Sequence, residues 1–175
     1  MNDVPTASQT VGPFFSIGLS HLWVRKTAPS DATREHVTIR GRVLDGDGVG
    51  VPDAILEIWQ RGENEGGASR FRRVATGEHG EFEFSATKPA MAREADGSVH
   101  APHFVVMVFM RGLLRHLVSR VYIAGEAANA DDTVLNLVPE ARRETLLATP
   151  NETRDSEFVW DIRLQGAAET VFFET

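Results

Sequence analysis

Cysteine is absent from the 175-residue sequence, and tyrosine occurs once, as Tyr122. Without cysteine, disulfides, thiolate metal sites and thiol nucleophiles are excluded. Lysine and arginine together number 18 against 25 acidic residues, which gives a formal net charge of −7. An acidic chain with no basic stripe lacks the cations that displace counterions from phosphates, so we expect no nucleic-acid partner.

A long hydrophobic run is also missing. The longest nearly uninterrupted apolar segment is 103–110, far short of the roughly 20 residues that span a bilayer. Residues 1–5 lack the charged and apolar regions of a signal peptide. We therefore expect a cytoplasmic protein without membrane attachment. Because 103–110 is rich in β-branched and aromatic residues between Pro102 and Gly112, it predicts a central strand buried on both faces.

The remainder of the chain predicts many short strands and little helix. Apolar and polar residues alternate in 37–44 and 157–166, as in half-buried strands. Further strands are expected at 54–60, 70–75, 81–85, 117–123 and 170–173, with 70–75 and 81–85 forming a hairpin, and helical turns at 126–130 and 139–147. This pattern is typical of an all-β, single-domain β-sandwich.

The N-terminal region differs in character from the strands. We expect residues 1–36 to form an extended arm and linker, and residues 37–175 to form the sandwich domain. Gly12, Pro13 and several large apolar side chains lie in 10–19. Exposed apolar segments are unfavourable in water, so this arm should dock, either on its own domain or on a partner.

The sequence contains no recognisable set of catalytic residues. His100 and His103 are three apart and would point to opposite faces of a strand. The other histidines are scattered at positions 21, 36, 79 and 116. No G-x-S-x-G or phosphate-binding loop is present, and Glu57, Glu81 and Glu83 are expected on solvated faces. The residues alone predict an acidic sandwich with an apolar arm.

Several segments resemble the intradiol ring-cleaving dioxygenases. They are 8–14, 41–45, 51–60, 101–103 with 109–112, 135–137 with 142–146, and 161–166 with 169–173. Together they are similar to the α chain of two-chain members of that family and cover nearly the whole sequence. The resemblance implies the family's sandwich, whose core is transthyretin-like, and a homologous iron-bearing β subunit as partner.

The family's Fe(III) is held by two tyrosinates and two histidines, and the histidines lie two apart on one strand. His103 begins the matching strand, but Val105 stands two residues later. No tyrosine occurs near 88–91 or in the shortened loop 61–69, and Tyr122 matches no ligand position. The resemblance therefore implies no metal site and no catalytic residue in this chain, with iron on the partner and His103 a hydrogen-bonded remnant.

The resemblance places Gly12, Pro13 and Phe14 in the wall of a substrate pocket between the two chains. Glycine lets the backbone come close to a planar ring, and proline fixes the backbone conformation of that approach. Phe14 replaces a tyrosine common in that arm, so a phenol hydrogen bond is lost. Arg111 matches an arginine near the pocket, where its charge would attract the carboxylate of 3,4-dihydroxybenzoate. An inter-chain salt bridge of Arg111 is the alternative.

The expected function is that of a non-iron-binding α subunit in a large hetero-oligomeric intradiol dioxygenase. The complex would convert 3,4-dihydroxybenzoate and O2 to 3-carboxy-cis,cis-muconate, and this chain would form part of the pocket wall. One alternative is a stand-alone transthyretin-like binding or interaction module. Another is a self-sufficient iron enzyme, against which the single tyrosine argues.

Overall fold

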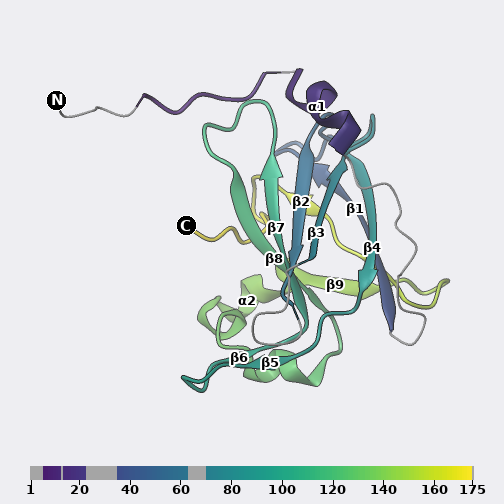
Figure 1. Ribbon diagram of the computed structural model, residues 1–175, viewed down its shortest axis with the longest axis vertical. Helices are drawn as coiled ribbons and strands as arrows, with labels where there is room; N and C mark the ends of the chain where they lie inside the picture. Colours follow the sequence, from purple (N-terminus) through teal and green to yellow (C-terminus); the bar gives the residue numbers. More distant parts are fainter. Residues whose placement is uncertain (1–5, 13, 23–34, 63–69, 175) are drawn as a thin grey trace.

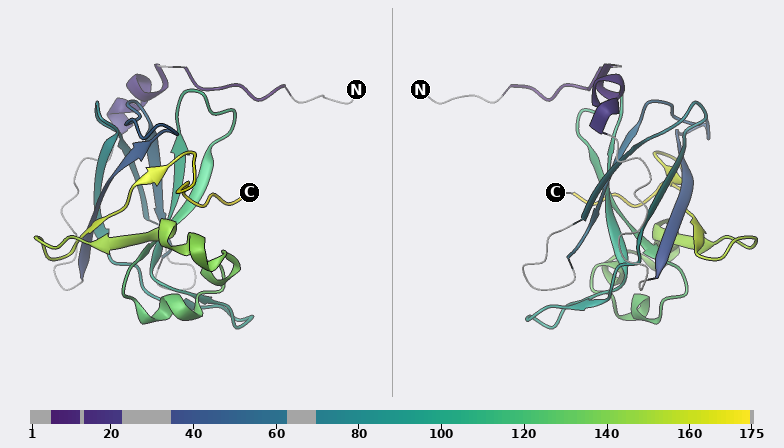
Figure 2. Two further views of the ribbon diagram at one scale, coloured as in Figure 1. Left: turned by 180° about the vertical axis from the view of Figure 1, so that it is seen from behind. Right: turned by 45° about the vertical axis from the view of Figure 1, so that its right-hand side comes forward.

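The computed structural model describes residues 6–12, 14–22, 35–62 and 70–174. Its strands form two facing layers, with the helical segment 14–22 at one end and the helical turns of 127–146 toward the opposite end (Figures 1 and 2). This arrangement confirms the predicted all-β sandwich with short helical turns. The boundary predicted between arm and domain stays a prediction, although the first strand begins at His36.

The two layers are joined through one strand. The first layer contains β1 (His36–Leu44), β4 (Glu81–Thr87), β10 (Glu157–Val159) and β11 (Ile162–Arg163). The second contains β2 (Ile55–Gln60), β3 (Arg70–Ala75), β7 (His103–Phe109) and β8 (Leu117–Ile123). Strand β9 (Leu147–Pro150) pairs with β8 and β10 and so makes one nine-stranded sheet.

Short elements occupy the ends of the sandwich. A small antiparallel sheet is formed by β5 (Ala92–Arg93) and β6 (Val99–His100). The helical elements are α1 (Phe14–Leu19), η1 (Ser20–Leu22), η2 (Ala127–Asp131), η3 (Leu135–Leu137), α2 (Glu140–Arg143) and η4 (Glu144–Leu146). The turns predicted at 126–130 and 139–147 are therefore confirmed to within a residue or two.

The core lies between the layers and contains aliphatic and aromatic side chains from both. Phe84 of β4 meets Phe104 of β7 edge to face, with ring centroids 5.4 Å apart. On β7, Phe104 and its alternate neighbours are fully buried, whereas Val105 and Met107 are half-buried. The prediction of a strand buried on both faces is wrong for this second face, whose side chains are only half-buried.

One predicted pairing and the extent of two predicted strands are wrong. Strands β3 and β4 do not form a hairpin, because β3 pairs with β2 and β4 pairs with β1, so the chain crosses between layers at 76–80. The strand expected at 157–166 is interrupted at Trp160, whose carbonyl approaches β1 so closely that a Cβ at Gly41 would lie 1.7 Å from it. The segment 170–173 contributes only one isolated bridge, between Val118 and Phe173.

Candidate functional site

The N-terminal arm lies against the β7–β8 hairpin. The Gly112 amide donates a hydrogen bond of 2.7 Å to the Thr10 hydroxyl. The rings of Phe15 and Phe109 contact each other with centroids 6.0 Å apart. The arm therefore docks on its own domain, which was one of the two expected arrangements. Pro13 lies outside the described residues.

The hairpin turn brings the arginine expected at the substrate pocket beside this arm. The Leu113 amide donates to the Met110 carbonyl at 3.5 Å, and Gly112 has a φ of +89°. Glycine adopts that conformation without steric strain. Because Gly112 is bonded to the arm, Arg111 lies one residue from the arm's anchoring point on the hairpin. The structure thus brings together the predicted Gly12 and Arg111 segments.

Docking of the arm leaves part of its apolar surface in water. Phe14 is 78% exposed and Ile17 is 66% exposed, although Phe15 of the same helix contacts the domain. Leu114 at the hairpin tip is 63% exposed. It lines a small hollow, of about 60 Å³, with residues of the arm. Several large exposed apolar side chains near one end of a domain are a feature expected of an interaction surface.

Arg111 is paired within its own chain. Its Nε lies 2.7 Å from the Oδ2 atom of Asp53, in the β1–β2 connection. The sequence analysis missed Asp53 as a partner, because the two residues belong to separate loops and no local pattern links them. The Arg111 side chain is 54% exposed, so the pairing does not remove the guanidinium from solvent. Its expected contact with substrate or partner stays a prediction.

A broad hollow of about 1200 Å³ runs along the hairpin and the C-terminal segment. Arg111, Arg115 and His116 line it together with Glu169 and Glu174. It carries side chains of both charges, so it does not by itself select an anion. A volume above that of ordinary small-ligand pockets fits a surface on which another chain rests better than a closed pocket for a small molecule.

The strand position matching the family's histidine ligands retains one imidazole. His103 Nδ1 donates a hydrogen bond of 2.7 Å to the Ala101 carbonyl, since a carbonyl can only accept. Metal-binding histidines commonly make this contact with the ring nitrogen that does not bind the metal. Burial, the largest effect on this ring, lowers the pKa of His103 to about 4. The imidazole is therefore neutral near pH 7, and its hydrogen bond agrees with the predicted remnant.

Tyr122 lies beside His103 on the neighbouring strand, but its hydroxyl is hydrogen-bonded to Asp132. The rings of His103 and Tyr122 are 5.2 Å apart. The Tyr122 hydroxyl donates a hydrogen bond of 3.0 Å to Asp132 Oδ1, and burial raises the pKa of Tyr122. The Tyr122 hydroxyl is therefore engaged by Asp132 inside the chain. In the ranges that the structure describes, no group of three or more histidine and acidic residues is arranged to hold a metal ion.

The cavity beside His103 has a volume of about 270 Å³ and is lined also by Arg61, Arg93 and His100. Val105, two residues after His103, offers no donor atom. The residues around this cavity therefore do not fit ferric iron, whose usual ligands in the family are two tyrosinates and two histidines. No chemical step is assigned to this cavity.

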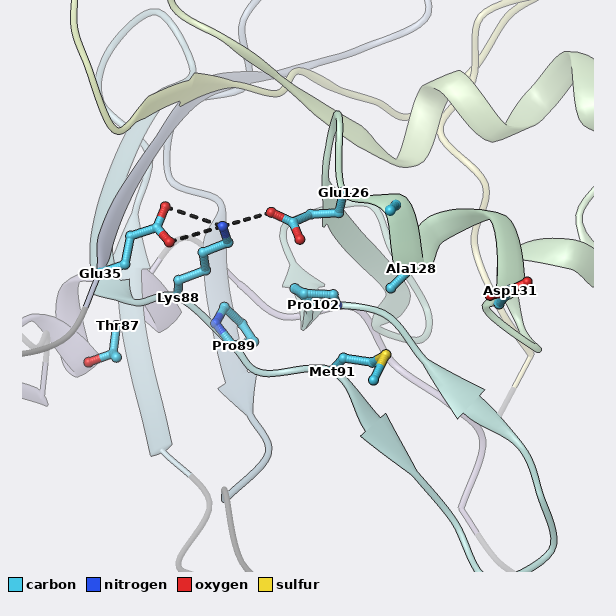
Figure 3. Close-up of a pocket in the computed structure, with 10 residues that line it drawn as sticks. Glu35, Thr87, Lys88, Pro89, Met91, Pro102, Glu126, Ala128 and Asp131 are labelled. Carbon is cyan, nitrogen blue, oxygen red and sulfur yellow. Dashed lines mark hydrogen bonds and ion pairs between the residues drawn. The ribbon is translucent and has the colours of Figure 1, made fainter.

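Figure 3 shows another pocket, of about 680 Å³, at the end of the sandwich opposite the arm. The Lys88 ammonium points between two carboxylates, 2.7 Å from Glu126 and 3.0 Å from Glu35. Glu126 is the main cause, and Glu35 a further one, of a raised pKa at Lys88. Because the only lysine of this pocket is bonded to two acids, we interpret the pocket as a structural ion-pair site.

One carboxylate expected in water is largely shielded instead. Glu57 on β2 accepts a hydrogen bond of 2.9 Å from Arg73 Nε on β3, and each side chain is 17% exposed. The prediction of a solvated Glu57 is wrong, because the directly opposite position in the antiparallel pair carries an arginine. This cross-strand ion pair accounts for the shielded carboxylate of Glu57, so no catalytic role is needed to explain it.

The sequence was compared with known proteins. Over 97% of its length and 96% of the relative's, it is 39% identical to the protocatechuate 3,4-dioxygenase alpha chain of Pseudomonas putida. The alpha chain of the same name from Burkholderia cepacia is 42% identical, with the same coverage. The chain belongs to the protocatechuate 3,4-dioxygenase alpha chain family. This membership confirms the resemblance found in the sequence segments.

Solved structures show that the chain has the intradiol dioxygenase fold. A 3-chlorocatechol 1,2-dioxygenase from Rhodococcus opacus 1CP matches 93% of the chain and 68% of its own length, with a TM-score of 0.62 and 17% identity. Catechol 1,2-dioxygenase from Acinetobacter sp. ADP1 matches 77% of the chain with a TM-score of 0.59 and 22% identity. The alpha chain spans about half, 53%, of that enzyme.

No protein-family model matches the sequence. Among the described residues of this alpha chain, no helix is long and apolar enough to cross a membrane. The cytoplasmic location expected from the sequence stays a prediction.

Proposed function

We propose that the chain is the non-iron-binding α subunit of a protocatechuate 3,4-dioxygenase, and that it acts with a homologous iron-bearing β subunit in a large hetero-oligomer. The complex would convert 3,4-dihydroxybenzoate and O2 to 3-carboxy-cis,cis-muconate. The observation that carries the proposal is the likeness to two protocatechuate 3,4-dioxygenase alpha chains along almost the entire sequence.

Fe(III) on the partner would supply substrate chelation and electronic activation of the ring. The reasons for placing it there are local. His103 is the one remaining histidine at the family's ligand positions, and the hydroxyl of Tyr122 is bonded to Asp132. This chain supplies no group to the reacting atoms in our account. Its contribution is to shape the pocket wall and to set the charge at its edge.

The arm and the hairpin turn carry that contribution. Gly12, Pro13 and Phe14 would form part of the wall, with the exposed face of α1 resting on the partner. Arg111 would attract and orient the substrate carboxylate through its permanent positive charge. Substrate orientation of this type raises the fraction of productive encounters without requiring a catalytic group.

The experiment is to prepare the chain alone, then together with a candidate iron-bearing β chain, and to follow O2 consumption with 3,4-dihydroxybenzoate. We expect ring cleavage only from the complex. Ring cleavage by this chain alone would contradict the proposal. A complex that does not form, with a chain that is stable alone, would support the stand-alone module instead.

Arg111→Ala tests the role of the arginine within that complex. A raised KM for 3,4-dihydroxybenzoate, with the complex intact on gel filtration, supports contact with the substrate. Loss of the complex supports an inter-chain salt bridge. A KM equal to that of the unmodified complex contradicts the substrate role.

A further inference from the structure

The β1–β2 connection holds one carboxylate in a strained but well-supported position. Asp53 has a φ of 61°, and Ser156 is the other non-glycine residue with positive φ among the described residues. Aspartate and asparagine tolerate this conformation better than most side chains. Such conformations persist only where the surrounding structure enforces them, and they are frequent at functional sites.

A buried hydroxyl enforces the conformation at Asp53. The Ala54 amide donates a hydrogen bond of 2.9 Å to Thr76 Oγ1, and that hydroxyl donates one of 2.8 Å to the Val51 carbonyl. Thr76 is only 9% exposed. The backbone on both sides of Asp53 is thus tied to the end of β3, so the core fixes the position of the carboxylate.

That carboxylate contacts Arg111 at the Nε side of the guanidinium. Asp53 Oδ2 lies 2.7 Å from Nε. The Arg111 side chain nevertheless remains 54% exposed, so the guanidinium stays accessible to an anion. A guanidinium binds a second carboxylate in bidentate geometry through its two terminal amino groups. The bridge therefore limits rotation of the side chain while leaving its end open to an anion.

We propose that Asp53 is a positioning residue for Arg111, holding the guanidinium so that its two terminal amino groups meet the carboxylate of the substrate. The inference rests on the proposed function of Arg111 and adds the group that orients it. It also explains why an ion pair whose arginine is 54% exposed, and which therefore contributes little to stability, stands on a strained residue anchored to the core.

Two effects of Asp53 oppose each other, and their sizes differ. Its negative charge repels an anionic substrate, and because the Arg111 side of the pair is open to solvent, removing that charge would lower KM by less than about threefold. Losing the bridge lets the arginine side chain rotate, and immobilising it again on binding would raise KM by about 2- to 10-fold. Positioning and simple charge repulsion therefore predict opposite directions of change.

The test compares Asp53→Asn with the unmodified complex containing the iron-bearing partner. Asparagine keeps the backbone conformation and removes the charge. We expect KM for 3,4-dihydroxybenzoate to rise about 2- to 10-fold with kcat little changed. Catechol, which has no carboxylate, serves as substrate or competitive inhibitor, and its constant should not change. A KM for 3,4-dihydroxybenzoate that is unchanged or lower would overturn the proposal.

The controls separate positioning from stability. Asp53→Gly also keeps the backbone conformation and should reproduce the effect of asparagine. Ser156→Gly relaxes the other positive φ and should leave KM unchanged. In the double variant with Arg111→Ala, the Asp53 substitution should have no further effect, since there is no guanidinium left to orient. An additive effect would overturn the proposal.

The Arg111→Ala single variant distinguishes a failure of the substrate role of Arg111 from a failure of the positioning role of Asp53. If it raises KM while Asp53→Asn does not, the role of Arg111 stands and the positioning role of Asp53 falls. If Arg111→Ala leaves KM unchanged, the substrate role of Arg111 fails, and the positioning role fails with it.

Discussion

The hydroxyl of Tyr122 donates a hydrogen bond of 3.0 Å to the buried carboxylate of Asp132. This contact joins the only tyrosine of the chain to a carboxylate that also accepts backbone hydrogen bonds, from the amides of Ala101, Val134 and Leu135. The pair is therefore part of the structural support beneath the second sheet layer. It engages the phenol hydroxyl in a hydrogen bond within the chain.

Asp132→Ala should strongly destabilise the protein. The substitution leaves three backbone amides and the Tyr122 hydroxyl without their acceptor, and we expect a loss of about 3–5 kcal/mol in the free energy of unfolding. Urea denaturation of the purified chain measures it. Asp131→Ala is the matched control, because that neighbouring side chain is exposed, and it should change stability by less than about 0.5 kcal/mol. Equal effects of the two variants would refute this structural role.

His103 should make stability depend on mildly acidic pH. Burial holds its pKa near 4 in the folded protein, below about 6.5 in the unfolded chain. Its contribution is complete above about pH 6.5 and is lost as pH falls toward the folded pKa. Between about pH 6.5 and 5, the free energy of unfolding should fall by about 2 kcal/mol more in the unmodified chain than in His103→Gln. The control, His79→Gln at an exposed position, should show the same dependence of unfolding free energy on pH as the unmodified chain. If His103→Gln and the unmodified chain also show the same dependence, the prediction is contradicted.

Lys88 should stabilise the end of the sandwich up to high pH. Its ammonium bridges Glu126 and Glu35, so Lys88→Met should lose about 1 kcal/mol at pH 7. The folded pKa is raised, so the contribution is complete below about pH 10.4, the unfolded value, and disappears as pH rises through the folded pKa. Thermal unfolding of both proteins should show the difference shrinking in alkali. Arg93→Met, at an exposed arginine without an ion pair to another described residue, should have no comparable effect.

The exposed side of α1 should matter for assembly and not for folding. Phe14→Asp and Ile17→Asp place charges on side chains that are already mostly in water, so the chain alone should unfold as before. In the complex, each charge would be buried at the proposed interface, and we expect at least a tenfold weaker association with the β chain. Leu137→Asp, at a residue that is 80% exposed on η3, is the matched control. Association measured by light scattering should be normal for that variant, and unaffected binding by the α1 variants would argue against this interface.

Alternation of apolar and polar residues predicted most of the strands, because period-two burial is a local property of the chain. Strand pairing is not local. Gly77 and Gly80 suggested a hairpin of 70–75 with 81–85, yet each strand pairs with an earlier one. Likewise, the interruption at Trp160 depends on its close approach to Gly41 in another strand, which no pattern within 157–166 reveals.

The candidate site was predictable only in part for the same reason. The resemblance pointed to Gly12, Phe14 and Arg111, and the structure brings the arm against the hairpin that carries the arginine. The Thr10–Gly112 hydrogen bond and the Arg111–Asp53 bridge were not predicted. Both contacts join loops that are distant in the sequence. No local pattern indicates which loops meet in the folded chain.

The most direct test of the account is the iron content of two preparations, the homogeneous recombinant chain alone and its complex with the β chain, measured by elemental analysis together with the visible spectrum. We predict substoichiometric iron and no red-brown ferric–tyrosinate colour for the chain alone, and about one iron per α–β pair with that colour for the complex. Stoichiometric iron with ring-cleaving turnover in the chain alone would contradict the account.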